Sequence, residues 1–302
     1  MAKPFIKWAG GKRQLMEHLL SRLPSDFGDD EYRKYAEPFV GGGALMFKMF
    51  ELKLIDEALI IDYNMDLVLT YEVIKSDVAL LIEKLSILQH DYDAYGYEER
   101  KKQYFELRTK FNSRLNDEKS SFSLGERAER ASQFIYLNKV GFNGLFRVNS
   151  KGEFNVPPSD LKTKTIVDHS NLKKVSKVLQ TVTIRSGDFS DCIDWIDENT
   201  FVYFDPPYKP ISKTSFTAYA NSNFNDTEQE RLADFCILLK KKNVKAMVSN
   251  SDPTQMTPPD YLFERIYSLE KGFTRKKVAA IRSINSNGAG RGSITELIIT
   301  NY

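Results

Sequence analysis

Short apolar runs alternate with amphipathic segments along most of the chain, and this alternation predicts strands separated by helices. We expect strands at residues 34–39, 58–61, 181–185, 200–204, 244–249 and 293–302. Helical spacing of apolar residues marks 14–22, 44–50 and 226–239, and a long, charged helical stretch runs from about 67 to 130. Strands that alternate with helices on both sides of an inserted block predict an α/β protein with a doubly wound core and a second domain.

The inserted block is expected at residues 76–174, with the core formed by 1–75 and 175–302. The block is mainly helical, and its aromatic residues are expected to fill its interior. Its second part predicts a β-hairpin, because residues alternate on either side of a turn at 149–152. Phe142 and Leu145 stand on glycine-flanked backbone and are expected to contact something outside the core. A contact with another protein and an ordinary hairpin are the alternatives.

The composition is that of a globular protein, and it bears on the cellular compartment in which the protein is expected. Of 302 residues, 41% are apolar and 28% charged, which is ordinary. No run of about 18 apolar residues predicts a membrane span, and no apolar segment of a secretion signal follows the N-terminus. Cys192 and Cys236 lack disulfide or metal spacing, as expected in the cytoplasm. The three histidines are scattered, so no metal site is expected.

Positive charge gathers in two stretches of a chain whose net charge is only +2. Residues 271–291 carry six cations and no carboxylate, and residues 139–174 carry seven cations against three carboxylates. Contacts with nucleic-acid phosphates need such local basic surfaces. A solvated charged face is the alternative, so the stretches permit a nucleic-acid partner without requiring one.

The N-terminal segment contains Gly10-Gly11-Lys12 ahead of a helical pattern. A phosphate-binding P-loop would need a glycine where Ile6 stands and a hydroxyl residue where Arg13 stands, so that interpretation fails. A glycine turn with a lysine at a helix start still favours an anionic group such as a carboxylate. A purely structural turn is the alternative.

A second glycine-rich turn, residues 40–43, joins an expected strand to an expected helix. Met46 breaks the dinucleotide fingerprint, so the turn alone is a weak signal. The next strand ends at Asp62, which lies 21 residues after Gly41. In nucleotide-binding βαβ units an acid at about this distance receives ribose hydroxyls. Together the turn and the acid predict a nucleoside ligand without a pyrophosphate.

The apolar run 200–204 ends in Asp205-Pro206-Pro207-Tyr208. Parallel strands deliver such residues to the carboxyl edge of a sheet, where open α/β proteins bind ligands. The prolines fix φ and lack N–H donors, so their carbonyls stay available as acceptors. A carboxylate, a carbonyl and an aromatic ring side by side predict a site that grips a planar amine. A third strand-end acid, Asp188, precedes Phe189.

Taken in order, five segments resemble the Dam and DpnM type, the alpha group, of DNA adenine N6-methyltransferases. These segments are Phe5–Lys12, Glu37–Ala44, Asn143–Asn149, Gly187–Phe189 and Asp205–Tyr208. The resemblance extends over nearly the whole chain. It implies a Rossmann-like methyltransferase core, with the inserted block acting as the DNA target-recognition domain.

The resemblance implies S-adenosyl-L-methionine as the cofactor. Its methionine end is expected at the Gly10 turn and its adenosine near the glycine-rich turn and the strand-end acids. The matching cofactor residues are Trp8, Gly10, Lys12, Phe39, Gly41, Asp62, Asp188, Phe189 and Asp205.

The catalytic residues that the resemblance implies are Asp205, Pro206 and Tyr208. The Asp205 carboxylate and the Pro206 carbonyl would each accept one N–H of the adenine amine, and its lone pair would turn toward the methyl group. Tyr208 would stack on the adenine, which must be flipped out of the duplex to be reached.

The resemblance also implies a target sequence, GATC, read from duplex DNA. Lys7 and Arg147 match the readers of guanine, and Leu145 and Pro157 match the contacts to thymine, which agrees with the chemistry of the base edges. Phe142 matches an aromatic wedge, and Asn143 would hold the base left without its partner.

Two other functions stay open on the sequence alone. An RNA or protein amine methyltransferase would use the same Asp-Pro-Pro-Tyr site, and a DNA-binding regulator would bind without catalysis. A separate restriction endonuclease as partner and a solitary role are both compatible with the sequence. We expect a monomer that contacts no membrane.

Overall fold

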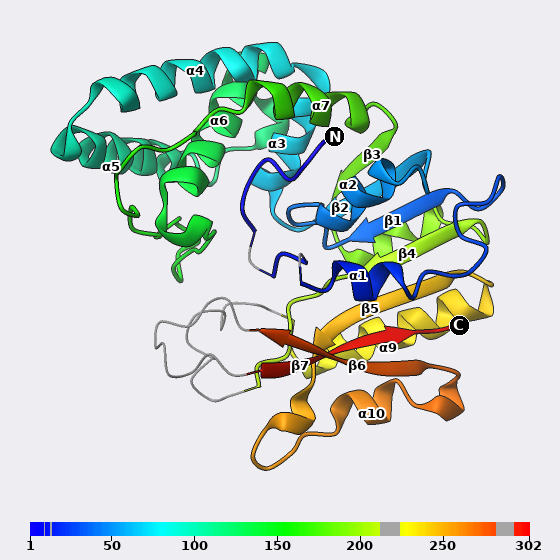
Figure 1. The fold of residues 1–302 in the computed structure, drawn as a ribbon. Helices are drawn as coiled ribbons and strands as arrows, with labels where there is room; N and C mark the ends of the chain where they lie inside the picture. Colours follow the sequence, from blue (N-terminus) through cyan, green and yellow to red (C-terminus); the bar gives the residue numbers. More distant parts are fainter. Residues whose placement is uncertain (9, 13, 212–223, 282–292) are drawn as a thin grey trace. The chain divides into compact units, whose positions relative to one another are not determined.

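The computed structural model describes residues 1–8, 10–12, 14–211, 224–281 and 293–302 (Figure 1). Within these ranges seven strands form one sheet in the order β3-β2-β1-β4-β5-β7-β6. Their bounds are β1 Lys34–Pro38, β2 Glu57–Asp62, β3 Val182–Ser186, β4 Thr200–Phe204, β5 Lys245–Ser251, β6 Thr274–Ile281 and β7 Ser293–Thr300. The expected α/β class is confirmed, and all six expected strands are present within two residues of their predicted bounds.

Strand β4 is the strand that carries the Asp205 motif. Every residue of β4 is buried, and it pairs in parallel with β1 and with β5. A strand covered on both faces reads as a continuous apolar run, which is why the sequence located it. In the register of β4 with β5, Tyr203 lies opposite Met247 and Phe204 opposite Val248. Asp205 therefore leaves the sheet beside the carboxyl-terminal half of β5.

The chain divides into two compact units. The first comprises residues 1–11, 40–52 and 60–188, and the second comprises residues 12–39, 53–59 and 189–302. The chain crosses from one unit to the other at five peptide bonds. The predicted boundaries of a catalytic and a recognition domain, at 75/76 and 174/175, stay a prediction, because compactness does not report which residues bind which ligand.

The first unit is mainly helical. Its helices are α2 Ala44–Glu51, α3 Met65–Ser76, α4 Val78–Ala94, α5 Tyr97–Ser113, α6 Leu124–Val140 and α7 His169–Leu179, with short 3₁₀ turns at Lys119–Ser121 and Phe142–Gly144. Helix α6 begins with a capping box between Ser123 and Glu126, which satisfies N–H groups that the first turn leaves open. It packs against α3, α4 and α5. Of the aromatic residues expected to fill this interior, Tyr92, Tyr104 and Phe111 are buried, whereas Phe105 is half-buried and Tyr95 and Tyr97 are exposed.

A buried ion pair joins two of these helices. The Asp66 carboxylate of α3 receives two hydrogen bonds, at 2.8 and 2.9 Å, from the guanidinium of Arg130 on α6. Arg130 also donates to the Phe111 carbonyl and lies over the Phe111 ring, 3.4 Å from its centroid. These contacts compensate two charges that burial would otherwise penalise strongly.

The predicted hairpin forms only in part. Its two sides meet at two isolated antiparallel bridges, Gly141 with Pro158 and Val148 with Phe154, rather than as two continuous strands. Asn149 closes the turn, since its N–H donates to the Glu153 carbonyl at 2.9 Å. Strand continuity is lost because Phe142–Gly144 coils into a 3₁₀ turn.

The second unit contains β1, β4, β5, β6 and β7 with helices α1 Met16–Leu20, α9 Asp226–Lys241 and α10 Leu262–Ile266, and 3₁₀ turns at Phe189–Asp194, Pro253–Gln255 and Leu269–Lys271. Helix α9 runs beside β5 (Figure 1). Strand β6 was not predicted, because its arginine and lysines interrupt the apolar pattern that marks a strand. It forms a strand through continuous antiparallel pairing with β7. Across the described ranges, no helix is both long and apolar enough to cross a bilayer.

Candidate active site

The Asp205 carboxylate is the centre of a polar cluster in the second unit. The ammonium of Lys12 lies 2.7 Å from Asp205 Oδ1, and the side chains are only 7% and 21% exposed. The Ser249 hydroxyl donates to the same oxygen at 3.0 Å. Oδ1 is thus held twice, whereas Oδ2 accepts no hydrogen bond from the described residues. The arrangement fixes the carboxylate and leaves one of its oxygens available to a ligand.

The two prolines after Asp205 differ in the state of their carbonyls. The Pro207 carbonyl accepts a hydrogen bond from the Gln229 side chain at 3.0 Å. The Pro206 carbonyl accepts none from the described part of the chain. A second acceptor is therefore available one residue after Asp205. The prediction that both proline carbonyls stay available was wrong for Pro207, whose carbonyl Gln229 occupies.

Tyr208 completes the cluster. Lys12 Nζ lies 4.5 Å from the centre of the Tyr208 ring, which is a favourable cation–π distance. The Tyr208 hydroxyl donates to Glu296 on β7 at 3.2 Å. Glu296 was not predicted as a site residue, although an acid between Thr295 and the apolar run 297–299 is a signal that could have found it.

The charges of this cluster shift one another's pKa values. Burial alone would lower the pKa of Lys12, but Asp205 and Tyr208 together raise it above its ordinary value, so Lys12 stays protonated. Burial raises the pKa of Asp205, and Lys12 and Ser249 oppose that rise. Burial likewise raises the pKa of Glu296. A carboxylate that burial makes reluctant to stay charged gains from accepting further hydrogen bonds.

In the first unit, the glycine-rich turn and Asp62 are joined directly. Asp62 Oδ2 accepts the N–H of Gly41 at 3.0 Å, and Oδ1 accepts the N–H of Asn64 at 2.9 Å. Burial raises the pKa of Asp62 and these two bonds oppose it. Each carboxylate oxygen has a second lone pair, so Asp62 retains capacity for the hydroxyls expected of it.

Trp8 packs directly on this turn. Gly41 has φ +49°, and a Cβ there would lie 2.5 Å from the Trp8 ring, so only glycine fits. Trp8 also contacts two aromatic rings: Phe146 stacks on it at 5.9 Å and 20°, and Phe134 lies 6.4 Å away at 38°. The structure thus brings predicted cofactor residues Trp8, Gly41 and Asp62 together within one unit.

The remaining strand-end acid of the first unit has an aromatic partner that sequence reasoning missed. The hydroxyl of Tyr63 donates to Asp188 Oδ2 at 2.8 Å, and the Tyr63 side chain is 64% exposed. The signal available in the sequence was a tyrosine directly after the strand-end acid Asp62. Gly10 is also exposed.

Phe39 and Phe189 lie in the second unit, where their rings stack at 5.6 Å and 29°. Phe189 is 1% exposed, and the guanidinium of Arg231 covers its ring at 4.0 Å. Phe39 is half-buried and holds a positive φ of 77°, which is uncommon for a residue with a side chain. Of this pair, Phe39 presents the more accessible ring.

The residues predicted to bind DNA all lie in the first unit. Lys7 is held through its backbone: its N–H donates to the Asn138 side chain at 3.0 Å, and its carbonyl accepts from the same side chain at 2.8 Å. Asn138 also donates to the Gly144 carbonyl at 2.8 Å. Asn138 therefore ties Lys7 to the turn that follows Phe142, a role that the sequence did not predict.

That turn presents its side chains outward. Phe142 is 50% exposed, Asn143 and Pro157 are also exposed and Leu145 is half-buried. The Phe142 N–H donates to the Pro157 carbonyl at 2.9 Å. Arg147 is exposed, and Asn155 orients it by accepting from Nε at 2.8 Å. Apart from Lys7, the predicted readers and the predicted wedge therefore share the surface segment 142–157.

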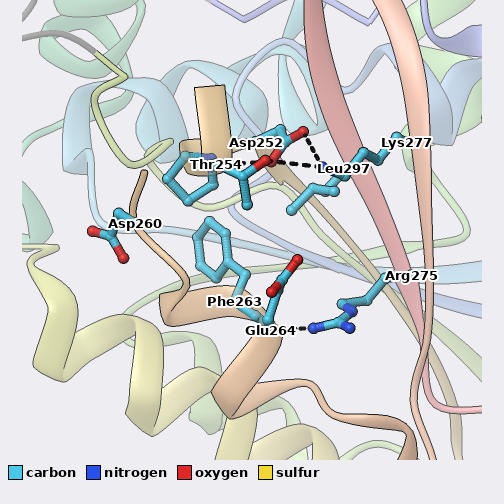
Figure 2. Close-up of a pocket in the computed structure, with 9 residues that line it drawn as sticks. Asp252, Thr254, Asp260, Phe263, Glu264, Arg275, Lys277 and Leu297 are labelled. Atoms are coloured by element: carbon cyan, nitrogen blue, oxygen red, sulfur yellow. Dashed lines mark hydrogen bonds and ion pairs between the residues drawn. The ribbon is translucent and has the colours of Figure 1, made fainter. Parts of the chain in front are cut away.

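A separate pocket of about 130 Å³ lies in the second unit next to α10 (Figure 2). Its charged lining includes Asp252, which pairs with Lys277 at 2.9 Å, and Arg275, which donates to the Phe263 carbonyl at 3.2 Å. None of the predicted site residues lines it. The Asp252–Lys277 ion pair neutralises Asp252, the most buried charged residue of this pocket. The pocket is therefore not the candidate active site.

The known proteins that this chain resembles are methyltransferases. The sequence profile of the D12 class N6 adenine-specific DNA methyltransferases matches residues 8–284. The chain is 45% identical to a type II methyltransferase, M.MjaIII, of Methanocaldococcus jannaschii over 99% of both chains. It is 38% identical to the type II methyltransferase M1.LlaDCHI of Lactococcus lactis (99% and 95% covered) and 32% identical to a DNA adenine methylase of Vibrio cholerae (98% and 95% covered).

Proposed function

Because this chain belongs to the D12 class of N6 adenine-specific DNA methyltransferases, we propose that Asp205 and Pro206 grip the exocyclic amine of the target adenine. One observation carries the proposal: Asp205 Oδ1 is held by two donors, while Oδ2 and the Pro206 carbonyl stay available among the described residues. The amine has two N–H bonds, so two acceptors match it.

The adenine amine is a poor nucleophile, because its lone pair is delocalised into the ring. Two acceptors that hold its N–H bonds in a fixed direction favour a geometry in which the lone pair leaves conjugation. Asp205 also stabilises the positive charge that develops on nitrogen during transfer. The proton that the amine loses during methyl transfer is the one on the N–H bond that points to Asp205.

Tyr208 binds the base in this proposal. Lys12 lies near the Tyr208 ring, and the ring face away from the ammonium stacks on the adenine. Chemistry on a base requires that it leave the duplex, and the exposed Phe142 fills the space that it leaves. Asn143 pairs with the base that remains.

The methyl donor proposed here is S-adenosylmethionine, which supplies a methyl group on a positively charged sulfur when bound. The residues fit such a group, because half-buried Asp62 retains lone pairs for ribose hydroxyls and Asp188 lies beside an exposed aromatic ring. The assigned residues of the first unit are Trp8, Gly10, Gly41, Asp62 and Asp188. Those of the second unit are Lys12, Phe39, Phe189 and Asp205.

We infer GATC as the target. Arg147 and Lys7 would read guanine edges, and Leu145 and Pro157 would contact the thymine methyl. The support is that Asn155 orients the guanidinium of Arg147 and Asn138 fixes the backbone of Lys7. The enzyme is proposed to act as a cytoplasmic monomer on duplex DNA, either beside a separate restriction endonuclease or in a solitary role.

Methylation of oligonucleotide duplexes by the purified chain tests the function. Duplexes with GATC, with single substitutions of each base pair, and an RNA of the same sequence are incubated with labelled S-adenosylmethionine. We expect label only in GATC duplex DNA, and loss of label with Asp205→Ala. Label in RNA would favour the amine methyltransferase alternative, and equal activity of Asp205→Ala would remove Asp205 from the mechanism.

A further inference from the structure

A chain of two hydrogen bonds connects Asp205 to a residue inside the sheet. The Tyr203 hydroxyl lies 2.8 Å from Ser249 Oγ, and Ser249 Oγ lies 3.0 Å from Asp205 Oδ1. Tyr203 and Ser249 are both fully buried. The register of β4 with β5 places all three residues on the same face of the sheet.

The direction of both hydrogen bonds follows from the number of protons. A serine hydroxyl has one proton, and it donates that proton to the Asp205 carboxylate, which can only accept. Ser249 must therefore accept from Tyr203. Burial raises the pKa of Tyr203 well above its ordinary value, so the phenol keeps its proton. The donors thus run one way, from Tyr203 through Ser249 to Asp205.

We propose that Ser249, oriented by Tyr203, is a positioning residue for methyl transfer. It holds Asp205 Oδ1, so that Oδ2 faces the adenine amine. Lys12 alone would not select Oδ1 over Oδ2. Its ammonium is a point charge on a flexible stem, so it can pair equally well with either carboxylate oxygen. A hydroxyl fixed within a sheet satisfies one oxygen only. The inference rests on the proposed role of Asp205.

Ser249 also has an electrostatic effect on Asp205. Its hydrogen bond opposes the rise that burial imposes on the pKa of Asp205. The other charged or titratable groups of this face are Lys12 beside Asp205, Tyr208 and Glu296 beside Lys12, and Glu37, which accepts from Tyr35 at 2.9 Å. Ser249 thus helps to keep Asp205 in the form that accepts from an amine.

Three variants separate positioning from folding. Ser249→Ala removes the donor, Ser249→Thr keeps a hydroxyl, and Tyr203→Phe removes only the orienting group. Single-turnover methylation rates are measured from pH 5 to 9, together with the dissociation constants of duplex DNA and of S-adenosylmethionine. Circular dichroism and thermal melting check the fold of each variant.

We expect Ser249→Ala to slow methyl transfer by about 10- to 100-fold, since a hydrogen bond to a charged group is lost. Both dissociation constants should stay within about twofold, and the acid limb of the rate profile should move to higher pH. Tyr203→Phe should slow transfer less, and Ser249→Thr should restore most of the rate.

Wild-type rates and an unchanged pH profile in both Ser249→Ala and Tyr203→Phe would overturn the inference. If Ser249→Ala fails to fold, Tyr203→Phe alone decides. Failure of the underlying function looks different, because the wild-type protein itself would then transfer no methyl group to adenine.

Discussion

The ammonium of Lys12 lies 2.7 Å from Asp205 Oδ1, and it opposes the rise that burial imposes on the pKa of Asp205. Replacement by an uncharged side chain of similar length leaves burial as the main influence. We expect Lys12→Met to raise the pKa of Asp205 further. The carboxylate would then be protonated at higher pH, and the acid limb of the methylation rate should move upward.

Single-turnover rates measured against pH check this expectation, with Lys12→Arg as the variant that keeps the positive charge. Lys12→Arg should retain the wild-type position of the acid limb. An acid limb that does not move in Lys12→Met would show that Lys12 does not control the protonation of Asp205.

Gly41 occupies a position that excludes any side chain. With φ +49° and a Cβ position 2.5 Å from Trp8, Gly41→Ala should displace the indole and weaken binding of S-adenosylmethionine by at least about tenfold, a cost typical of strained backbone. Gly125 in α6 is the matched control, because a Cβ there meets nothing within 4 Å. Isothermal titration of both variants decides, and equal affinities would contradict the packing argument.

The Asp66–Arg130 pair contributes to stability because both partners are buried. Asp66→Ala leaves the Arg130 charge without its partner and should lower the free energy of unfolding by about 3–5 kcal/mol. Glu72→Ala removes a more exposed pair with Arg127, at 2.6 Å, and should cost about 0–1 kcal/mol. Urea unfolding measures both. Similar losses would mean that burial does not distinguish the two pairs.

Glu296 should make the stability of the protein depend on pH. Burial raises its pKa above the ordinary value of 4.5, so the folded state binds a proton more tightly than the unfolded state. Stability is then lost as the pH rises from 4.5 through the folded pKa. Glu296→Gln keeps an acceptor for Tyr208 and should be more stable than wild type at pH 7.

The same comparison at pH 4 provides the internal control, since both proteins are then uncharged at this position and should differ little. Glu83→Gln, an exposed change on α4, controls for the loss of one negative charge. A Glu296→Gln variant that is less stable than wild type at pH 7 would contradict the sign of this pKa shift.

Patterns of apolar residues predicted those elements whose structure follows from their own sequence and burial. The buried strand β4 and the amphipathic helix α9 were found because their periodicity follows from their own burial. Strand β6 was missed because Arg275, Lys276 and Lys277 interrupt it and only β7 makes it a strand. The hairpin was overestimated, since alternation does not reveal the 3₁₀ turn at Phe142.

The candidate site was likewise predicted only where local sequence determines it. Asp205, Asp62 and Gly41 follow from motifs at strand ends. Their hydrogen-bond partners do not, because Ser249 and Glu296 reach the Asp205 cluster from other strands through sheet register. Register depends on pairing between distant segments, so an isolated acid such as Glu296 can be noticed in the sequence, but its partner in the site cannot be read there.

Methylation-sensitive sequencing of genomic DNA treated with the purified protein tests the central claim most directly. Unmethylated DNA is incubated with S-adenosylmethionine and either wild-type protein or Asp205→Ala. The account predicts N6-methyladenine at GATC in the wild-type sample and none above background with Asp205→Ala. Methylation of another base, or N6-methyladenine that persists with Asp205→Ala, would contradict it.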